Sequence, residues 1–155
     1  MMTLSPPKLE HVADLEVFVD APIEVGATDG GLRRLIAITG GTVAGPKLRG
    51  RVLPGGADFQ IVRPDSVAVL DARYVIELDD GTRAFVSNRA LRRATPELTA
   101  KLMRGEPVDP ALVYFRCVPE FEVPPGRWRW LAESVFVGTG ARRPDRVELS
   151  IYRMC

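Results

Sequence analysis

The chain has 155 residues, with 21 lysines and arginines against 20 aspartates and glutamates, which gives a formal net charge of +1 at pH 7. Nucleic-acid-binding domains usually carry a clear basic excess, so this balance argues against a nucleic-acid partner. No apolar run approaches the roughly 20 residues of a membrane-spanning helix, so we expect no membrane partner. The length is that of one domain, and we expect a single domain over residues 1–155.

Cysteine and histidine are scarce, with Cys117, Cys155 and one histidine, His11. They cannot complete a closed zinc ligand set, so we expect no metal. Neither Gly40-Gly41 nor Gly55-Gly56 opens a helix, as a phosphate-binding loop would, and we expect no cofactor. The N-terminus has no apolar stretch of the kind found in signal peptides, and sparse cysteine suits a reducing compartment. We therefore expect a cytoplasmic protein.

Alternation of apolar and polar residues predicts strands along most of the chain. Residues 9–19 alternate cleanly, with Glu10 and Asp14 on the polar side, as in an antiparallel strand with one wet face. Gly- and Pro-rich turns separate this run from the next, and a bulge is expected at Gly40-Gly41. The expected strands are 9–19, 33–39 continued by 42–44, 47–53, 58–63, 67–78, 83–90, 113–118, a broken strand over 127–131 and 134–137, and 146–154, with a loop at 119–126 and a turn at 138–143.

One short helix is predicted over residues 96–104. Thr95 is a good N-cap, and Pro96 and Glu97 suit the first helical turn. Gly105 follows where a C-terminal glycine commonly ends a helix. So short a helix is expected to plug or cover an end of the fold.

Nine or ten short strands with regular turns and one helix indicate an all-β sandwich or barrel. The last strand alternates almost to the end of the chain, which suggests that it pairs with an early strand. Such pairing leaves no open edge. The expected fold is a closed antiparallel β-barrel.

The run from Asp58 to Arg89 carries an unusual density of polar residues within apolar alternation. Its clearest signal is a hairpin at Asp80-Gly81. A two- or four-residue loop would place Tyr74, Ser87 and Arg89 on the inner face, and Arg73 with Asn88 on the other. A one-residue bulge would exchange the partners. The plainer alternative is a buried tyrosine satisfied by Ser87 and an arginine at an exposed strand end.

Other polar candidates follow from alternation. Asp58 and Gln60 share one face, toward either solvent or a polar interior, whereas Phe59 and Ile61 are expected in the core. Glu10 shares this ambiguity. Tyr114 and Arg116 also share a face, and an inward arginine would need a partner such as an anionic ligand. Trp130 and Trp128 share a strand face and are expected to pack at the core or rim.

Beyond these patterns, the chain resembles a bacterial and fungal family known as domain of unknown function 3237, or UPF0311. The resemblance covers nearly the whole chain and includes no named catalytic signature. It implies a closed β-barrel of calycin-like shape with an interior cavity, and suggests isomerase- or cyclase-type roles near aromatic or polyketide metabolism. The stretches that carry it are LEHVADLEV, ITGGTVAGPKLRGRVLPGGADFQIVRPD, LDARYVIELDDG, NRALR, GEPVDP, YFRCVPEFE and FVGTGARRPDRVELSIY.

The resemblance also points to particular residues. They fall where the family is most recognisable, namely Glu10, Asp58, Gln60, Arg73, Tyr74, Asn88 and Arg116. Two positions depart from the family pattern. Ala132 stands where an asparagine is expected, and Ala90 where a glycine is usual.

Three functions remain open. The first is a cofactor-independent isomerase, cyclase or lyase for an aromatic or polyketide-like substrate, with Asp58 or Glu10 as general base, Tyr74 as proton donor, and Arg116 or Arg89 at an oxyanion. Its substrate-binding candidates are Gln60, Arg73, Asn88, Arg89, Arg116, Tyr114 and Trp130. The second is a non-catalytic carrier or sensor of a small apolar ligand. The third is a filled barrel whose outer surface forms a homodimer.

Overall fold

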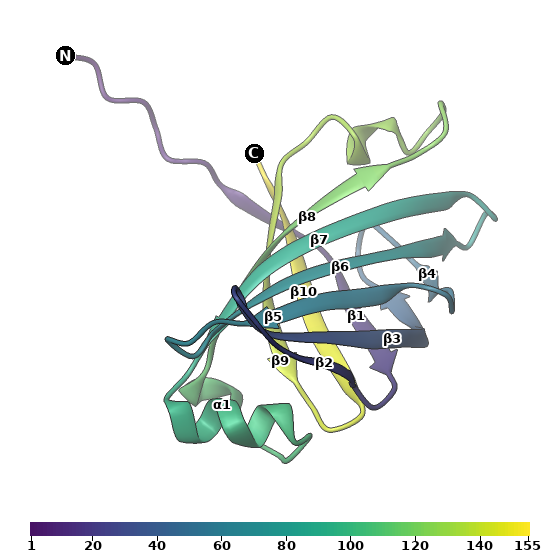
Figure 1. Cartoon of the computed structure of the whole chain (residues 1–155). Helices are drawn as coiled ribbons and strands as arrows, with labels where there is room; N and C mark the ends of the chain where they lie inside the picture. Colours follow the sequence, from purple (N-terminus) through teal and green to yellow (C-terminus); the bar gives the residue numbers. More distant parts are fainter.

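The computed structural model describes all residues, 1–155, and shows ten strands in one antiparallel sheet that curls around an interior (Figure 1). Three ranges match the sequence prediction at both ends, Leu9–Val19, Val67–Leu78 and Arg146–Met154. The strands are β1 (Leu9–Val19), β2 (Ile23–Thr28), β3 (Gly31–Ala44), β4 (Gly50–Val52), β5 (Ala57–Val62), β6 (Val67–Leu78), β7 (Arg83–Arg93), β8 (Tyr114–Glu122), β9 (Phe136–Arg142) and β10 (Arg146–Met154).

The barrel closes because β1 pairs on both of its edges. One edge pairs with β10 from Leu9 to Phe18, and the other pairs with the second half of β3. From β10 the ring continues through β9, β8, β7 and β6, and β4 and β5 together connect β6 to β3. The predicted closed antiparallel barrel, with its last strand beside an early one, is confirmed.

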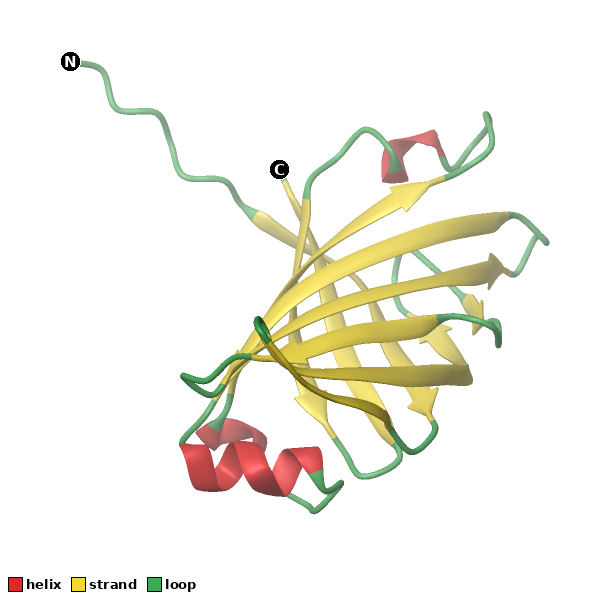
Figure 2. Cartoon of the chain, in the orientation of Figure 1, coloured by secondary structure: helices red, strands yellow, loops and turns green.

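The two ends of the barrel are covered differently (Figure 2). The helix α1 (Pro96–Met103) lies against one end, and Thr95 caps it by accepting a hydrogen bond from the Leu98 amide. A 3-10 turn, η2 (Arg129–Leu131), lies at the other end. Near η2 the barrel is filled by aromatic side chains, with the rings of Phe121 and Phe136 5.0 Å apart and edge to face. The open space in the barrel therefore lies away from the η2 end.

The hairpin register differs by one residue from the predicted one. Gly81 has a φ of +86°, and its N–H donates to the Leu78 carbonyl, while the Leu78 N–H donates to the Thr82 carbonyl. This is a three-residue loop with a glycine bulge, and it pairs Tyr74 with Val86 and Arg73 with Ser87. The predicted inner positions of Ser87 and Arg89 are therefore wrong.

Other predicted elements also need correction. A short strand, β2, occupies part of the predicted glycine-rich loop. The strand β8 continues into the predicted loop 119–126 as far as Glu122. Pro119 is tolerated there because β9 pairs with β8 only at Arg116 and Cys117. Residues 127–131 form a turn ending in η2 rather than a strand, so Trp128 and Trp130 do not share a strand face.

The predicted turn at 138–143 is instead most of β9, and its glycines explain the error. The space that a side chain at Gly140 would need is filled by the ring of Phe115, since an added Cβ would lie 2.7 Å from that ring. Gly140 is needed here for a close approach and does not mark a turn.

We expect Gly140→Ala to destabilise the fold by about 1–3 kcal/mol, because Phe115 must shift within a packed barrel. Urea unfolding measures the loss, and combining it with Phe115→Leu should recover part of it. If the two losses are simply additive, Gly140 and Phe115 are not coupled through this contact.

Candidate functional site

A row of polar side chains crosses the inside of the barrel on β5, β6 and β7. Ala72 on β6 pairs with Asp58 on one side and with Asn88 on the other, and all three side chains line the interior as one row. Asp58 is 8% exposed and Asn88 5%. Gln60, two residues from Asp58 on the same face, is 1% exposed, and Phe59 between them is 40% exposed. Asp58 and Gln60 therefore face the interior, and the prediction that Phe59 is core is wrong.

Arg34 on β3 begins a chain of hydrogen bonds that holds this row in place. Its guanidinium donates to the Gln60 side-chain oxygen at 3.0 Å and to the Met103 carbonyl of α1 at 2.8 Å. The Gln60 amide then donates to Asp58 at 3.2 Å, and the backbone N–H of Asp71 donates to the other carboxylate oxygen at 2.9 Å. The position of Asp58 is thus fixed from both sides, and the network also ties α1 to the barrel.

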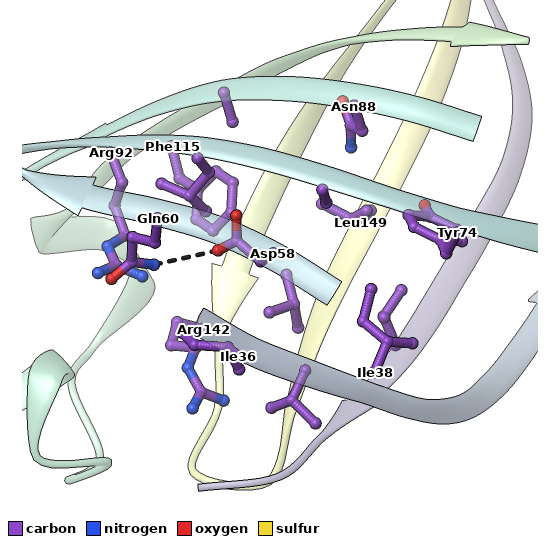
Figure 3. A pocket seen from close by; sticks show the side chains of 16 residues that line it. Ile36, Ile38, Asp58, Gln60, Tyr74, Asn88, Arg92, Phe115, Arg142 and Leu149 are labelled. Carbon is purple, nitrogen blue, oxygen red and sulfur yellow. Dashed lines mark hydrogen bonds between the residues drawn. The ribbon is translucent and has the colours of Figure 1, made fainter. Parts of the chain in front are cut away.

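Arg92 lies on the same inner face of β7 and is left without comparable partners (Figure 3). It is 2% exposed, and both its Nε and Nη2 atoms are buried without a hydrogen-bond partner. Arg142 on β9 points to the same region, and its Nη1 is held by the Arg146 carbonyl at 3.2 Å. Buried guanidinium donors without partners are rare and costly, so Arg92 calls for an explanation.

These side chains line a cavity of about 50 Å³ inside the barrel. Of its 16 lining residues, 11 are hydrophobic, and Ala72 and Ala90 leave the room that larger inward residues would fill. Tyr74 and Asn88 lie farther along the cavity from Arg92 and Gln60 (Figure 3). A space of this size holds a few water molecules or a small polar group, so a larger ligand requires the wall to move.

Burial dominates the electrostatics of the cavity. It raises the pKa of Asp58, although the Asp71 amide, Gln60 and the Arg92 charge oppose the shift. It lowers the pKa of Arg92 to about 10, and it raises that of Tyr74 beyond its ordinary value, so the phenol stays protonated. Outside the set of cavity-lining residues, burial also raises the pKa of Cys117 to about 11, which keeps that thiol out of its nucleophilic form. The cavity thus holds a carboxyl group whose pKa is raised, a neutral phenol and excess positive charge.

Four of the predicted site residues gather elsewhere, on the outer surface. Arg73, Arg89, Tyr114 and Arg116 line an open hollow of about 1010 Å³ over β6 to β9. The Arg116 guanidinium lies 5.3 Å from the centre of the Tyr114 ring. Their side chains lie on the opposite face of the sheet from Asp58, so they cannot act with it on one small molecule.

The remaining two predicted residues also lie away from the cavity. Glu10 is half-exposed, with its carboxylate 3.9 Å from the Lys47 ammonium group. Trp130 packs in η2, with its ring centre 6.1 Å from that of Phe136. Of the predicted site residues, the structure brings together at the cavity only Asp58, Gln60, Tyr74 and Asn88.

The sequence reasoning missed the three inner arginines, Arg34, Arg92 and Arg142. Two of them carried a usable signal, because Arg34 is in phase with Ile36, and Arg92 with Ala90, at the period of two that marks an inner face. Arg142 lay in the predicted turn. No three His, Cys, Asp or Glu side chains gather in a group that could hold a metal ion. Neither the length nor the hydropathy of any helix suffices for crossing a membrane.

Known proteins resemble this chain along its whole length. A UPF0311 protein of Bradyrhizobium diazoefficiens is 46% identical over 145 residues, covering 94% of this chain and 95% of its own. A solved Rhodopseudomonas palustris protein of unknown function has a TM-score of 0.92 at 38% identity, covering 98% of this chain and all of its own. A solved β-barrel-like protein of Acinetobacter baumannii has a TM-score of 0.87 at 36% identity, with full coverage of both chains.

A more distant relative has a named activity. The hydroalkoxylation enzyme phnH of Penicillium herquei is 29% identical over 86 residues, which cover 56% of this chain and 57% of phnH. The family described as protein of unknown function (DUF3237) matches residues 7–154. With that match and the close relatives that share its length, the chain belongs to the DUF3237 family.

Proposed function

We propose that the barrel interior is the active site of a cofactor-independent enzyme that uses acid–base chemistry to isomerise or cyclise a small molecule. The observation that carries the proposal is a buried carboxyl group, Asp58, fixed at the wall of a cavity that also holds the unpaired guanidinium of Arg92. Titratable groups placed in a cavity and perturbed by burial are typical of catalytic sites. Two inner residues of the sequence hypothesis, Asp58 and Tyr74, keep their roles.

The arrangement suits the addition of a hydroxyl group across a conjugated carbon–carbon double bond. Asp58 removes the hydroxyl proton while the oxygen attacks the distal alkene carbon and forms the new C–O bond. The alkene electrons move to the carbonyl oxygen, where the charge of Arg92 and Arg142 stabilises the enolate. Tyr74 then supplies a proton to the enolate carbon, and Asp58 returns its proton to the phenolate of Tyr74. The product is an isomer of the substrate, and no oxidant or reductant is consumed.

The name of the Penicillium herquei relative supports this reaction class, because hydroalkoxylation is the addition of an O–H group to a carbon–carbon multiple bond. The substrate is proposed to be aromatic or polyketide-like, since most residues that line the cavity are hydrophobic.

The proposal is tested with two hydroxy-enones of different size. One is an ortho-hydroxychalcone that closes to a flavanone, and the other is a short aliphatic hydroxy-enone that closes to a tetrahydrofuran. We expect ring closure faster than in buffer, with one enantiomer in excess because the cavity is chiral. The double variant Asp58→Asn/Tyr74→Phe should lose both effects, and Asp65→Asn, which changes an exposed aspartate, should keep them. Racemic product at the buffer rate with both substrates would exclude this chemistry.

A second candidate is a non-catalytic carrier of a small apolar molecule. The predominantly hydrophobic lining of the cavity favours it. A carrier would bind the hydroxychalcone without closing it, and Asp58→Asn would leave that affinity unchanged or raise it.

A further inference from the structure

Arg92 presents a pair of hydrogen-bond donors with a particular geometry. Its Nε and Nη2 atoms are the two that lack a partner. The hydrogens on these two atoms point in parallel along one edge of the guanidinium plane. This edge matches the two oxygens of a carboxylate, which it binds through two parallel hydrogen bonds.

No protein group accepts a hydrogen bond from that edge, although both of its nitrogen atoms are buried. Arg92 forms no ion pair, and neither does Asp58, the nearest buried carboxyl group. The Asp58 oxygens already accept hydrogen bonds from the Asp71 amide and from Gln60. Asp58 therefore balances part of the Arg92 charge from a distance and leaves its fork of donors free.

The charges that line the cavity do not cancel. Arg34 is paired with Glu24 at 2.9 Å, which leaves the buried Arg92 and the partly buried Arg142 facing the single carboxyl group of Asp58. The exposed Asp145 offsets part of the Arg142 charge from outside the cavity. With Asp58 ionised, positive charge remains in excess at the cavity wall, and one negative charge on a ligand would offset it.

We infer that this cavity binds planar oxygen monoanions, a carboxylate or an ionised enol or phenol, through two hydrogen bonds from Nε and Nη2 of Arg92. The inference rests on the proposed function and deepens it, because the enolate formed there from the neutral hydroxy-enone is such an anion at the same two donors. Arg142 adds charge at the cavity wall, and Asn88 offers a second polar contact farther along.

The test uses small probes and amide NMR titration of the intact protein. Acetate represents a carboxylate, 4-nitrophenolate an ionised phenol, and acetamide a neutral molecule with the shape of acetate. We expect saturable binding of at least one anion, with shifts centred on β5 and β7, and at least about tenfold weaker binding of acetamide. Inorganic phosphate should bind more weakly than the favoured monoanion, because its second charge exceeds the balance.

The matched variants are Arg92→Gln and Arg89→Gln, which change an inner and an outer arginine of the same strand. Arg92→Gln should weaken anion binding at least about tenfold. Arg89→Gln should leave it unchanged. Arg92→Lys keeps the charge without the parallel donors, so its affinity for the anion should lie between those of wild type and Arg92→Gln. The amide spectrum of each variant shows whether it remains folded.

The inference is overturned if neither anion binds saturably, if acetamide binds as well as acetate, if phosphate binds more tightly than both anions, or if Arg92→Gln binds like wild type. Anion binding needs no turnover, so this result is separate from the proposed reaction. Arg92-dependent binding in a protein that fails the hydroxy-enone assay would overturn the reaction and leave the anion site in place.

Discussion

Asp58→Asn should lower the rate of ring closure of a hydroxy-enone at least about 100-fold, because the amide cannot accept the hydroxyl proton. The substitution keeps the size of the side chain, and its oxygen can still accept the hydrogen bond from the Asp71 amide. We therefore expect the loss in kcat with little change in KM, since the hydroxyl proton moves only in the transition state. The measurement is steady-state kinetics of Asp58→Asn and of the control Asp65→Asn, which changes an exposed aspartate in a turn.

The pH dependence of the same rate identifies the group that titrates. Burial raises the pKa of Asp58, and the charges that face it are Arg92 and Arg142 in the cavity and Asp71 on the outer side of β6. A general base acts when ionised, so the rate should fall as the pH drops through a pKa above the ordinary aspartate value. In Arg92→Gln the fall should begin at a higher pH, because a charge that favours the ionised form is gone. A rate that stays level from neutral pH down to the ordinary aspartate range would contradict this role for Asp58.

The sequence was sufficient to predict the barrel because local patterns decide most of it. Apolar alternation marked the strands, and the Asp-Gly turn marked the β6–β7 hairpin. The register failed because the sequence does not distinguish a two-residue loop from a three-residue loop with a bulge at Gly81, and a one-residue slip reverses every face. That slip moved Asn88 inside and Arg89 outside. The strand register of the hairpin and the inward or outward direction of the β7 side chains thus both depended on the conformation of Gly81.

The candidate site could be predicted only in part, for a related reason. Asp58 and Gln60 are polar residues in phase with apolar ones, and alternation alone leaves both inward and outward positions open. The choice depends on which neighbours cover that face, and the covering partners, Arg34 and α1, come from distant parts of the chain. The inner arginines were missed because arginine is rarely buried. An arginine in a strand is therefore normally assigned to the outer face, even where the alternation places it in phase with apolar residues.

Arg92→Met should stabilise the protein without ligand by about 1–3 kcal/mol, because it replaces a buried charge with unpaired donors by an apolar side chain of similar length. Urea unfolding should show a higher midpoint with an unchanged slope. Arg89→Met, an exposed change on the same strand, should alter the free energy of unfolding by less than about 0.5 kcal/mol.

A stabilised Arg92→Met variant that no longer binds acetate would mean that Arg92 is kept for a ligand at the expense of the fold. The opposite result, a loss of more than about 2 kcal/mol, would mean that the charge of Arg92 holds Asp58 and the barrel together and has a structural role. The two outcomes differ in sign, so the experiment separates them without knowledge of the natural substrate. Positions 89 and 92 lie on the same strand and both pair with β6. The two variants therefore differ mainly in whether the replaced side chain points out of the barrel or into it.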